Sequence, residues 1–277
     1  MTVGFQIGTG GKADQIFGSV TDGTWVAPLP GYRAAFIPKT NPAPYAGIYA
    51  MIIHGSDKHT SAPAGDGFGT VRVNSGDVIR FAGALADGTP VSQGALLSQN
   101  GLWPLCISLY SGKGLVAGRI GFTNQASSHL SGSLSWIKLS GSWARYCPGG
   151  FTNECGGLGS AYLSTDSILN LTNASVIFSG DNSSPGFTNS VTPGSNGKIL
   201  SPDPHQLSMS ISRLSGTFRG STTDPSNGSS LSFRGAVLQK LNAGYGYLLG
   251  SGQNGEVILA QQVFLAILNR SCIGKGW

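Results

Sequence analysis

The sequence predicts an all-β fold: an antiparallel β-barrel, or two linked barrel-like or sandwich halves, built from duplicated hairpins. Short alternating apolar runs recur between turn signals at roughly eight to twelve residues, a spacing typical of barrels and sandwiches. Gly accounts for 43 of 277 residues and only 10% are charged, which indicates many tight turns and few helix surfaces. A hairpin phrase also recurs along the chain.

The recurring phrase lies at 91–122 and, in a fuller form, at 231–259. In both places Gly-Ala and two aliphatic residues lead to an aromatic strand, a Ser-Gly turn and a closing triplet that begins with Gly. An aromatic and glycine phrase precedes each copy and occurs once more at 17–24. Asp-Gly in such a phrase predicts a two-residue hairpin turn, because both residues tolerate positive φ. The copies therefore predict a duplicated hairpin unit.

The individual strands are predicted in chain order from these alternations and turns. A proline-bearing connector at 39–47 separates the second and third and is expected at the surface. The predicted strand segments are 17–29, 31–38, 48–55, 67–73, 77–85, 91–98, 103–110, 115–123, 130–139, 169–180, 198–200, 207–221, 230–240, 244–250 and 255–261.

The same pattern divides the chain into four parts. We expect a first β-rich half at 1–140, a Cys, Gly and Pro loop region at 141–167, a second β-rich half at 168–259 and an atypical tail at 260–277. A polar linker is expected at 181–196. The tail does not alternate, so a short helix or a shifted reading frame would explain it. This tail, together with an N-terminus that has no signal-peptide pattern, indicates a piece of a longer gene.

Charge and hydropathy exclude some classes of partner. The net charge is +5, but the 17 Lys and Arg residues are scattered singly, so nucleic-acid binding is not expected. No run of eighteen apolar residues occurs, so no membrane span is expected. The sequence does not specify an oligomeric state.

The cysteines do not have zinc-site spacing. Cys147 and Cys155 bracket a Gly- and Pro-rich loop and could bridge in an oxidising compartment. Cys106 lies in an apolar run, where a buried free thiol is expected.

Common catalytic motifs are missing or misplaced. No Gly-x-Ser-x-Gly pentapeptide is present. A Ser-x-x-Lys pattern joins Ser135 to Lys138, but residues three apart on a strand face opposite sides. The Gly-rich 8–12 segment lacks the earlier glycine and the Ser or Thr of a P-loop.

The densest polar constellation is a loop with His54, Asp57, His59 and Asp66. Imidazoles and carboxylates so close together could hold a divalent ion or share a proton, and either arrangement can activate a water molecule. We assign Asp57 and Asp66 as metal ligands and His54 or His59 as the base. An exposed hydrophilic loop is the alternative explanation.

Calcium is permitted by oxygen-rich turns elsewhere. It takes six to eight oxygen ligands, so a site must gather them from several loops. Local turn hydrogen bonds explain these aspartates more simply. The turn aspartates are Asp22, Asp87, Asp181 and Asp224.

Several aromatic residues could line a sugar- or acyl-binding cleft, although those on alternating strands are expected in the core. Trp143, in the loop region, is expected to be exposed. The set comprises Trp103, Tyr110, Trp136, Trp143, Tyr245 and Tyr247.

Several phrases between 17 and 259 resemble the C-terminal β-rich domain of large, uncharacterised secreted or surface proteins of Verrucomicrobia and related bacteria. They include FGSVTDGTWVAPLPGYRA, DGFGTVRV, ALADGTPVSQGALLSQNGLWPLCISLYSGKG, LSGSLSWIK and SFRGAVLQKLNAGYGYLLGSGQNG. The resemblance implies an extracellular or cell-surface location for the parent protein, and it implies no activity or catalytic residue.

Two functions of different classes remain. The first is a metal-assisted, calcium-dependent hydrolase of small esters or lactones, such as acyl lactones. Its support is that gene fragments of this kind are recovered when cloned environmental DNA is screened for such activity. The second is a non-catalytic extracellular β-module for adhesion or display that binds a cell-surface ligand.

Overall fold

The computed structural model describes residues 2–7, 15–56, 62–141, 146–165, 167–179, 186–202, 207–250 and 254–262. These residues form a small four-stranded sheet, an eight-stranded sheet and a closed eight-stranded barrel. All strand pairs are antiparallel, and the remaining regular structure is short 3-10 turns. The predicted all-β fold with two barrel-like halves is confirmed.

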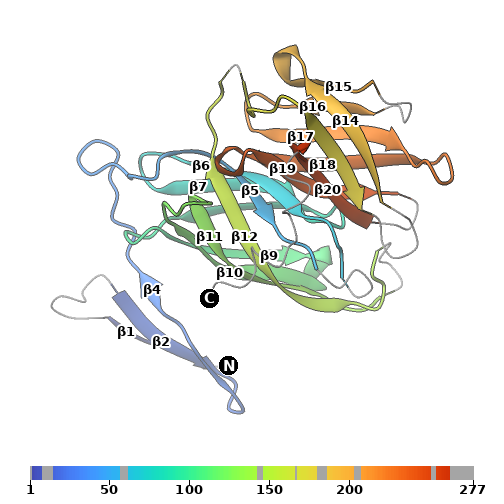
Figure 1. The fold of residues 1–277 in the computed structure, drawn as a ribbon. Coiled ribbons are helices and arrows are strands. Elements are labelled where there is room, and N and C mark those ends of the chain that lie inside the picture. The colour runs from blue at the N-terminus through green and yellow to red at the C-terminus, as the bar shows by residue number, and fades with distance from the viewer. Residues whose placement is uncertain are drawn as a thin grey trace.

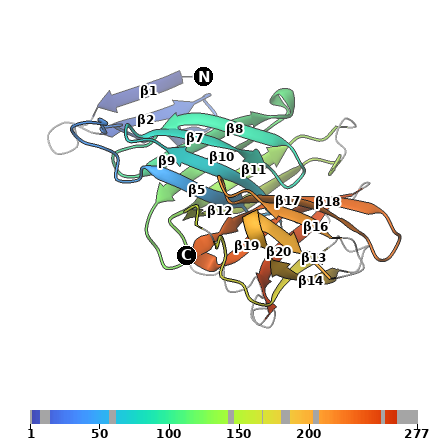
Figure 2. The same ribbon diagram turned by 90° about the horizontal axis from the view of Figure 1, so that it is seen from above.

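The small sheet lies beside the rest of the molecule, on the side away from the closed barrel (Figures 1 and 2). It consists of β1 (Thr2–Ile7), β2 (Gln15–Thr21), β3 (Val26–Pro28) and β4 (Gly31–Tyr32). Gly23 has φ +98°, and Asp22 Oδ1 accepts the Thr24 N–H at 2.9 Å. The hairpin predicted at 17–29 is thus confirmed, but the two-residue turn is wrong, because Thr21 pairs with Val26 and four residues lie between them. The predicted strand at 31–38 ends at Tyr32.

The eight-stranded sheet, here called the first barrel, has the strand order β8-β7-β6-β5-β12-β11-β10-β9. Its interior holds large apolar side chains, among them Trp103, Trp136 and Phe81. Alternation places them inside because every second residue of a strand faces the same side. The strands are β5 (Gly47–Ile53), β6 (Gly67–Val73), β7 (Val78–Ala84), β8 (Pro90–Leu96), β9 (Leu102–Leu109), β10 (Gly114–Phe122), β11 (Leu130–Lys138) and β12 (Phe151–Ala161).

Side chains join the two edges of the first barrel, β8 and β9. Gln93 Nε2 donates to Pro104 O at 3.2 Å, and Trp103 Nε1 donates to Gln93 Oε1 at 3.1 Å. Pro104 has no N–H to contribute, which suits an edge strand. One glutamine therefore bridges a seam that no backbone ladder closes.

The second barrel is closed by pairing of its first and last strands. Phe178, Phe218 and Phe233 pack in its interior. The strands are β13 (Ala174–Ser179), β14 (Phe187–Pro193), β15 (Lys198–Leu200), β16 (Ser208–Ile211), β17 (Thr217–Thr223), β18 (Ser230–Leu238), β19 (Ala243–Leu249) and β20 (Asn254–Gln261).

The prediction of a loop at 141–167 is wrong over 151–161, because these residues form the eleven-residue strand β12. This strand lies between β11 and β5 in the sheet and pairs with both. Its glycines indicated a loop, but the sheet needs them. A Cβ at Gly157 would lie 2.7 Å from Ile120 and 2.8 Å from Met51, and one at Gly159 would overlap Leu130. Glycine is required where side chains cross the strand so closely.

The linker predicted at 181–196 is likewise wrong for β14. Thr188, Ser190 and Thr192 face outward and alternate with inward-facing Asn189 and Val191, so this strand has the polar composition of a connector. Of the predicted tail at 260–277, Ala260 and Gln261 complete β20. Residues 263–277 lie outside the described residues.

The duplicated hairpin unit stays a prediction. Its upstream phrase occupies β8 to β10 and its downstream phrase occupies β18 to β20. The first set follows β5, β6 and β7, whereas the second ends the closed barrel. The two phrases therefore do not occupy matching places in the two barrels.

The barrels pack against each other through outward-facing residues of β5 and β6 on one side and of β18 and β19 on the other. Small and apolar side chains form this contact: Ala50, Ile52, Ala236, Leu238, Ala243 and Tyr245. A backbone hydrogen bond from Asp66 N to Gly246 O, 3.0 Å long, links the barrels at one margin. The contact thus fixes Asp66, the residue that precedes β6.

The described cysteines Cys106, Cys147 and Cys155 are free thiols. Cys155 is buried, and its Sγ lies 3.4 Å from Leu134 O. The prediction that Cys106 is buried is wrong, because the alternation of β9 turns it outward between Leu105 and Ile107. Within the described ranges, no helix has the length and apolar character to span a membrane.

Candidate functional site

The structure brings together two of the four predicted site residues, His54 and Asp66. His54 follows β5 and Asp66 precedes β6, so the two ends of one β5–β6 connection meet. His54 Nδ1 lies 3.3 Å from Asp66 Oδ1. Asp57 and His59 lie outside the described residues.

Asp66 is held rigidly. Its side chain is 1% exposed, and Oδ1 also accepts the Gly55 N–H at 3.1 Å. Its own N–H is bonded to the second barrel through Gly246. A carboxylate anchored in this way orients an imidazole, because the hydrogen bond at Nδ1 selects the tautomer and the ring direction.

The groups around Asp66 are kept neutral. Burial raises the pKa of the Cys155 thiol to about 12, and the charges of Glu154 and Asp66 add to the shift. Burial also raises the pKa of Tyr245 to about 12, with contributions from Asp66 and Glu256. Both groups stay protonated at neutral pH, so neither competes with His54 for the role of base.

His54 lies at the rim of this buried region. Its side chain is 31% exposed, and its backbone N–H donates to Gly156 O at 2.8 Å. A Cβ at Gly156 would lie 3.2 Å from the imidazole Cδ2, so glycine leaves room for the ring. The imidazole is therefore fixed on its Asp66 side and reachable from solvent.

The metal prediction is not supported by a ligand cluster in the described ranges, where no group of three or more His, Cys, Asp or Glu is placed to hold an ion. The turn aspartates Asp22, Asp87 and Asp224 accept hydrogen bonds from N–H groups two residues ahead, as turn chemistry predicts. Asp181 lies outside the described residues.

A second polar cluster, which the sequence reasoning missed, closes one end of the first barrel. Lys138 Nζ lies 3.3 Å from Asp87 Oδ2 and donates to Tyr146 O at 2.7 Å. Tyr110 donates to the same Asp87 oxygen at 2.7 Å. The Lys138 ammonium also sits 4.8 Å from the centre of the Tyr110 ring. Burial and the Asp87 charge raise the pKa of Tyr110, so it remains a donor.

The alternation of β11 contains a signal for this cluster. Leu134, Trp136 and Lys138 occupy successive inward positions, so a lysine ends an apolar face. Ser135 points to the other face and donates to Glu154 at 2.7 Å, as the strand argument against a Ser-Lys pair predicted.

The aromatic residues on strands form core, as predicted. Trp103, Trp136, Tyr245 and Tyr247 are buried. Trp143 lies outside the described residues.

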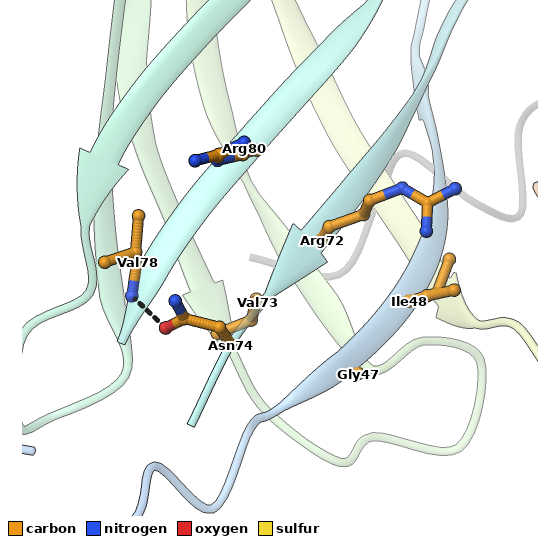
Figure 3. Close-up of a pocket in the computed structure, with 7 residues that line it drawn as sticks. All are labelled: Gly47, Ile48, Arg72, Val73, Asn74, Val78 and Arg80. Carbon is orange, nitrogen blue, oxygen red and sulfur yellow. Dashed lines mark hydrogen bonds between the residues drawn. The ribbon is translucent and has the colours of Figure 1, made fainter. Parts of the chain in front are cut away.

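An open depression lies on the outer face of the first barrel where β5, β6 and β7 adjoin (Figure 3). Its volume is about 280 Å³. It lies at the opposite end of β5 and β6 from His54 and Asp66. The lining residues are Gly47, Ile48, Arg72, Val73, Asn74, Val78 and Arg80.

No protein-family model, curated protein sequence or solved structure matches the chain.

Proposed function

We propose that the chain hydrolyses small esters or lactones, such as acyl lactones, with His54 as the general base and Asp66 as its orienting partner. The single observation that carries the proposal is the 3.3 Å contact between His54 Nδ1 and the buried Asp66 carboxylate. An imidazole paired with a buried carboxylate and reachable by water has the arrangement needed for general-base catalysis.

The reaction follows from these two side chains. His54 takes a proton from a water molecule as its oxygen attacks the acyl carbonyl, and Asp66 stabilises the imidazolium that forms. The C–O bond to the alcohol then breaks, and the imidazolium returns the proton to the departing oxygen. The products are a carboxylic acid and an alcohol, joined in one molecule when the substrate is a lactone.

Calcium dependence is part of the proposal. Asp66 with Asp57 would contribute carboxylate oxygens, and the ion would polarise the carbonyl oxygen. The remaining ligands would have to be other oxygens and water. Removing calcium with a chelator distinguishes the contribution of the ion from that of the His54 imidazole.

The test is hydrolysis of a panel of short esters and acyl lactones, with calcium and then with excess chelator. We expect His54→Gln and Asp66→Asn each to lower kcat/KM by about 100-fold or more. His129→Asn is the matched control, because this histidine bonds Ala161 N on the same barrel away from the pair. Circular dichroism establishes that each variant is folded.

Turnover that chelator abolishes and calcium restores supports the metal-assisted form, and turnover that resists chelator leaves the His54 and Asp66 mechanism without calcium. If Asp57→Ala combined with Asp66→Ala leaves both metal binding and turnover intact, the site assignment is wrong. Activity that His54→Gln leaves unchanged would also overturn it.

A second candidate is an extracellular or cell-surface β-module that binds a surface ligand without turnover. The observation that favours it is that side chains fill the interiors of both barrels, so a ligand would have to bind on the outer surface. Trp103 and Trp136 occupy the first interior, and Phe178 and Phe233 the second, where ligand-binding barrels hold their ligands. This candidate predicts no turnover of any ester in the panel.

A further inference from the structure

Two arginines stand directly opposite each other on the outer face of the first barrel. Arg72 on β6 and Arg80 on β7 are register partners, and both side chains are exposed. Like charges directly across a sheet destabilise it. Within the described ranges, neither guanidinium has a hydrogen bond or an ion pair. In Figure 3 the Arg72 guanidinium extends toward β5 and the Arg80 guanidinium extends away from it, so an anion bound by both would draw the two side chains together over the depression.

Both arginines line the depression of about 280 Å³, and no carboxylate lines it. Asn74 stands between their strands, in the β6–β7 turn (Figure 3). Its Oδ1 accepts the Gly76 and Val78 N–H groups at 2.9 and 3.0 Å. Since these bonds fix the amide, Nδ2 remains as a donor. Three side chains thus offer donors to one shallow site.

The depression also has an apolar side. Ile48 is the register partner of Arg72 on β5, and Val78 precedes Arg80 by two residues on the same face of β7. Gly94 is the partner of Arg80 on the other side, and a Cβ there would meet nothing within 4 Å. Across the four strands, the register therefore places an apolar side chain beside two cationic ones. The position next to Arg80 on its other side is left open by the glycine.

The net charge of +5 favours an anion over a cation. Among the described carboxylates, Asp77 in the β6–β7 turn is buried and is not one of the residues that line the depression. Exposed charges of one sign raise the local concentration of the opposite ion.

We propose that this depression binds a phosphate or sulfate monoester. Arg72 and Arg80 share the terminal oxyanion, since planar guanidinium groups match tetrahedral oxyanions with paired hydrogen bonds. Asn74 Nδ2 donates to a third oxygen, and Ile48 and Val78 contact the apolar part of the ester. The site is separate from His54 and Asp66 and does not depend on hydrolysis.

Calorimetric titration with phenyl phosphate, phenyl sulfate and inorganic phosphate tests the site. We expect saturable binding of a phenyl ester that weakens as salt rises, with inorganic phosphate weaker because it lacks the apolar part. Arg72→Gln and Arg80→Gln should each reduce affinity about 10-fold or more. Tighter binding of phenyl sulfate than of phenyl phosphate supports the site and assigns it sulfate esters.

The second barrel provides a matched control. Arg219 and Arg234 are register partners on β17 and β18 and are also exposed, but they do not line the depression. Arg219→Gln removes the same charge and should leave affinity within about two-fold. An equal loss in Arg219→Gln would show that binding follows net charge and would overturn the site, as would the absence of saturable binding of every probe.

Discussion

Lys138 Nζ lies 3.3 Å from Asp87 Oδ2 inside the end of the first barrel, and the two side chains are 3% and 2% exposed. Such a pair contributes little net stability, because desolvation of both ions offsets their attraction. Removing one partner is a different matter, since it leaves a buried charge alone. Tyr110 also donates to Asp87 Oδ2, the Thr89 N–H donates to Asp87 Oδ1, and Lys138 donates to the Tyr146 carbonyl. The ion pair, the Tyr110 ring and the Tyr146 carbonyl therefore form one connected polar cluster.

Lys138→Met should therefore destabilise the protein by about 3–5 kcal/mol, because Asp87 is left buried without its cation. Urea unfolding at pH 7 measures the loss. The double variant Lys138→Met with Asp87→Asn should recover part of it, because no charge remains. Lys198→Met, at an exposed position, is the control. A single variant as stable as the control would show that the folded protein does not need the Lys138 ammonium beside Asp87.

The fold was largely predictable because both barrels alternate. The segments with alternating apolar residues, such as β6 and β18, were predicted almost to the residue. β12 was not predicted because its inward face carries Gly157 and Gly159, and side chains from neighbouring strands fill the space beside them. A strand whose inward residues are glycine has no periodicity of its own to detect.

The candidate site was predictable only in part. His54 and Asp66 were recognised because they flank one short connection in the sequence. Lys138 and Asp87 are 51 positions apart, and they meet only when the sheet curls. The arginine pair was also missed, since Arg72 and Arg80 looked scattered until the register of β6 and β7 set them opposite each other.

The seam between β8 and β9 should depend on Gln93. Gln93→Ala removes both bonds and leaves the buried Trp103 Nε1 without its acceptor, which costs about 1–3 kcal/mol. Hydrogen exchange should become faster at β8 and β9 amides before other strands change. Ser92→Ala, the exposed neighbour on the same strand, is the control. Unchanged exchange in Gln93→Ala would mean that packing alone holds the edges together.

Gly65 should control the distance between the barrels. An added Cβ would overlap Gly255 O and lie 2.6 Å from Tyr247 Cβ. Gly65→Ala should therefore lower Tm and, by displacing Asp66, also reduce the proposed hydrolysis. Gly149→Ala, where a Cβ meets nothing within 4 Å, should change neither. Full stability in Gly65→Ala would show that this margin of the contact can open without cost.

His129 should make stability depend on pH. Burial, with a smaller contribution from the Lys240 charge, lowers its pKa below the ordinary 6.5. Its Nδ1 accepts the Ala161 N–H at 3.0 Å, which requires that nitrogen to be unprotonated. As pH falls through 6.5 the unfolded chain binds a proton before the folded one, so this contribution to stability declines until the folded pKa is reached.

Urea unfolding at pH 7.5, 6.5 and 5.5 measures this decline. His129→Gln keeps an acceptor for Ala161 without titrating, so its stability should fall less over the interval. Lys240→Met should raise the pKa of His129, which an NMR titration of the imidazole records directly. Parallel pH profiles for the native protein and His129→Gln would contradict the assignment, because the decline would then come from other groups.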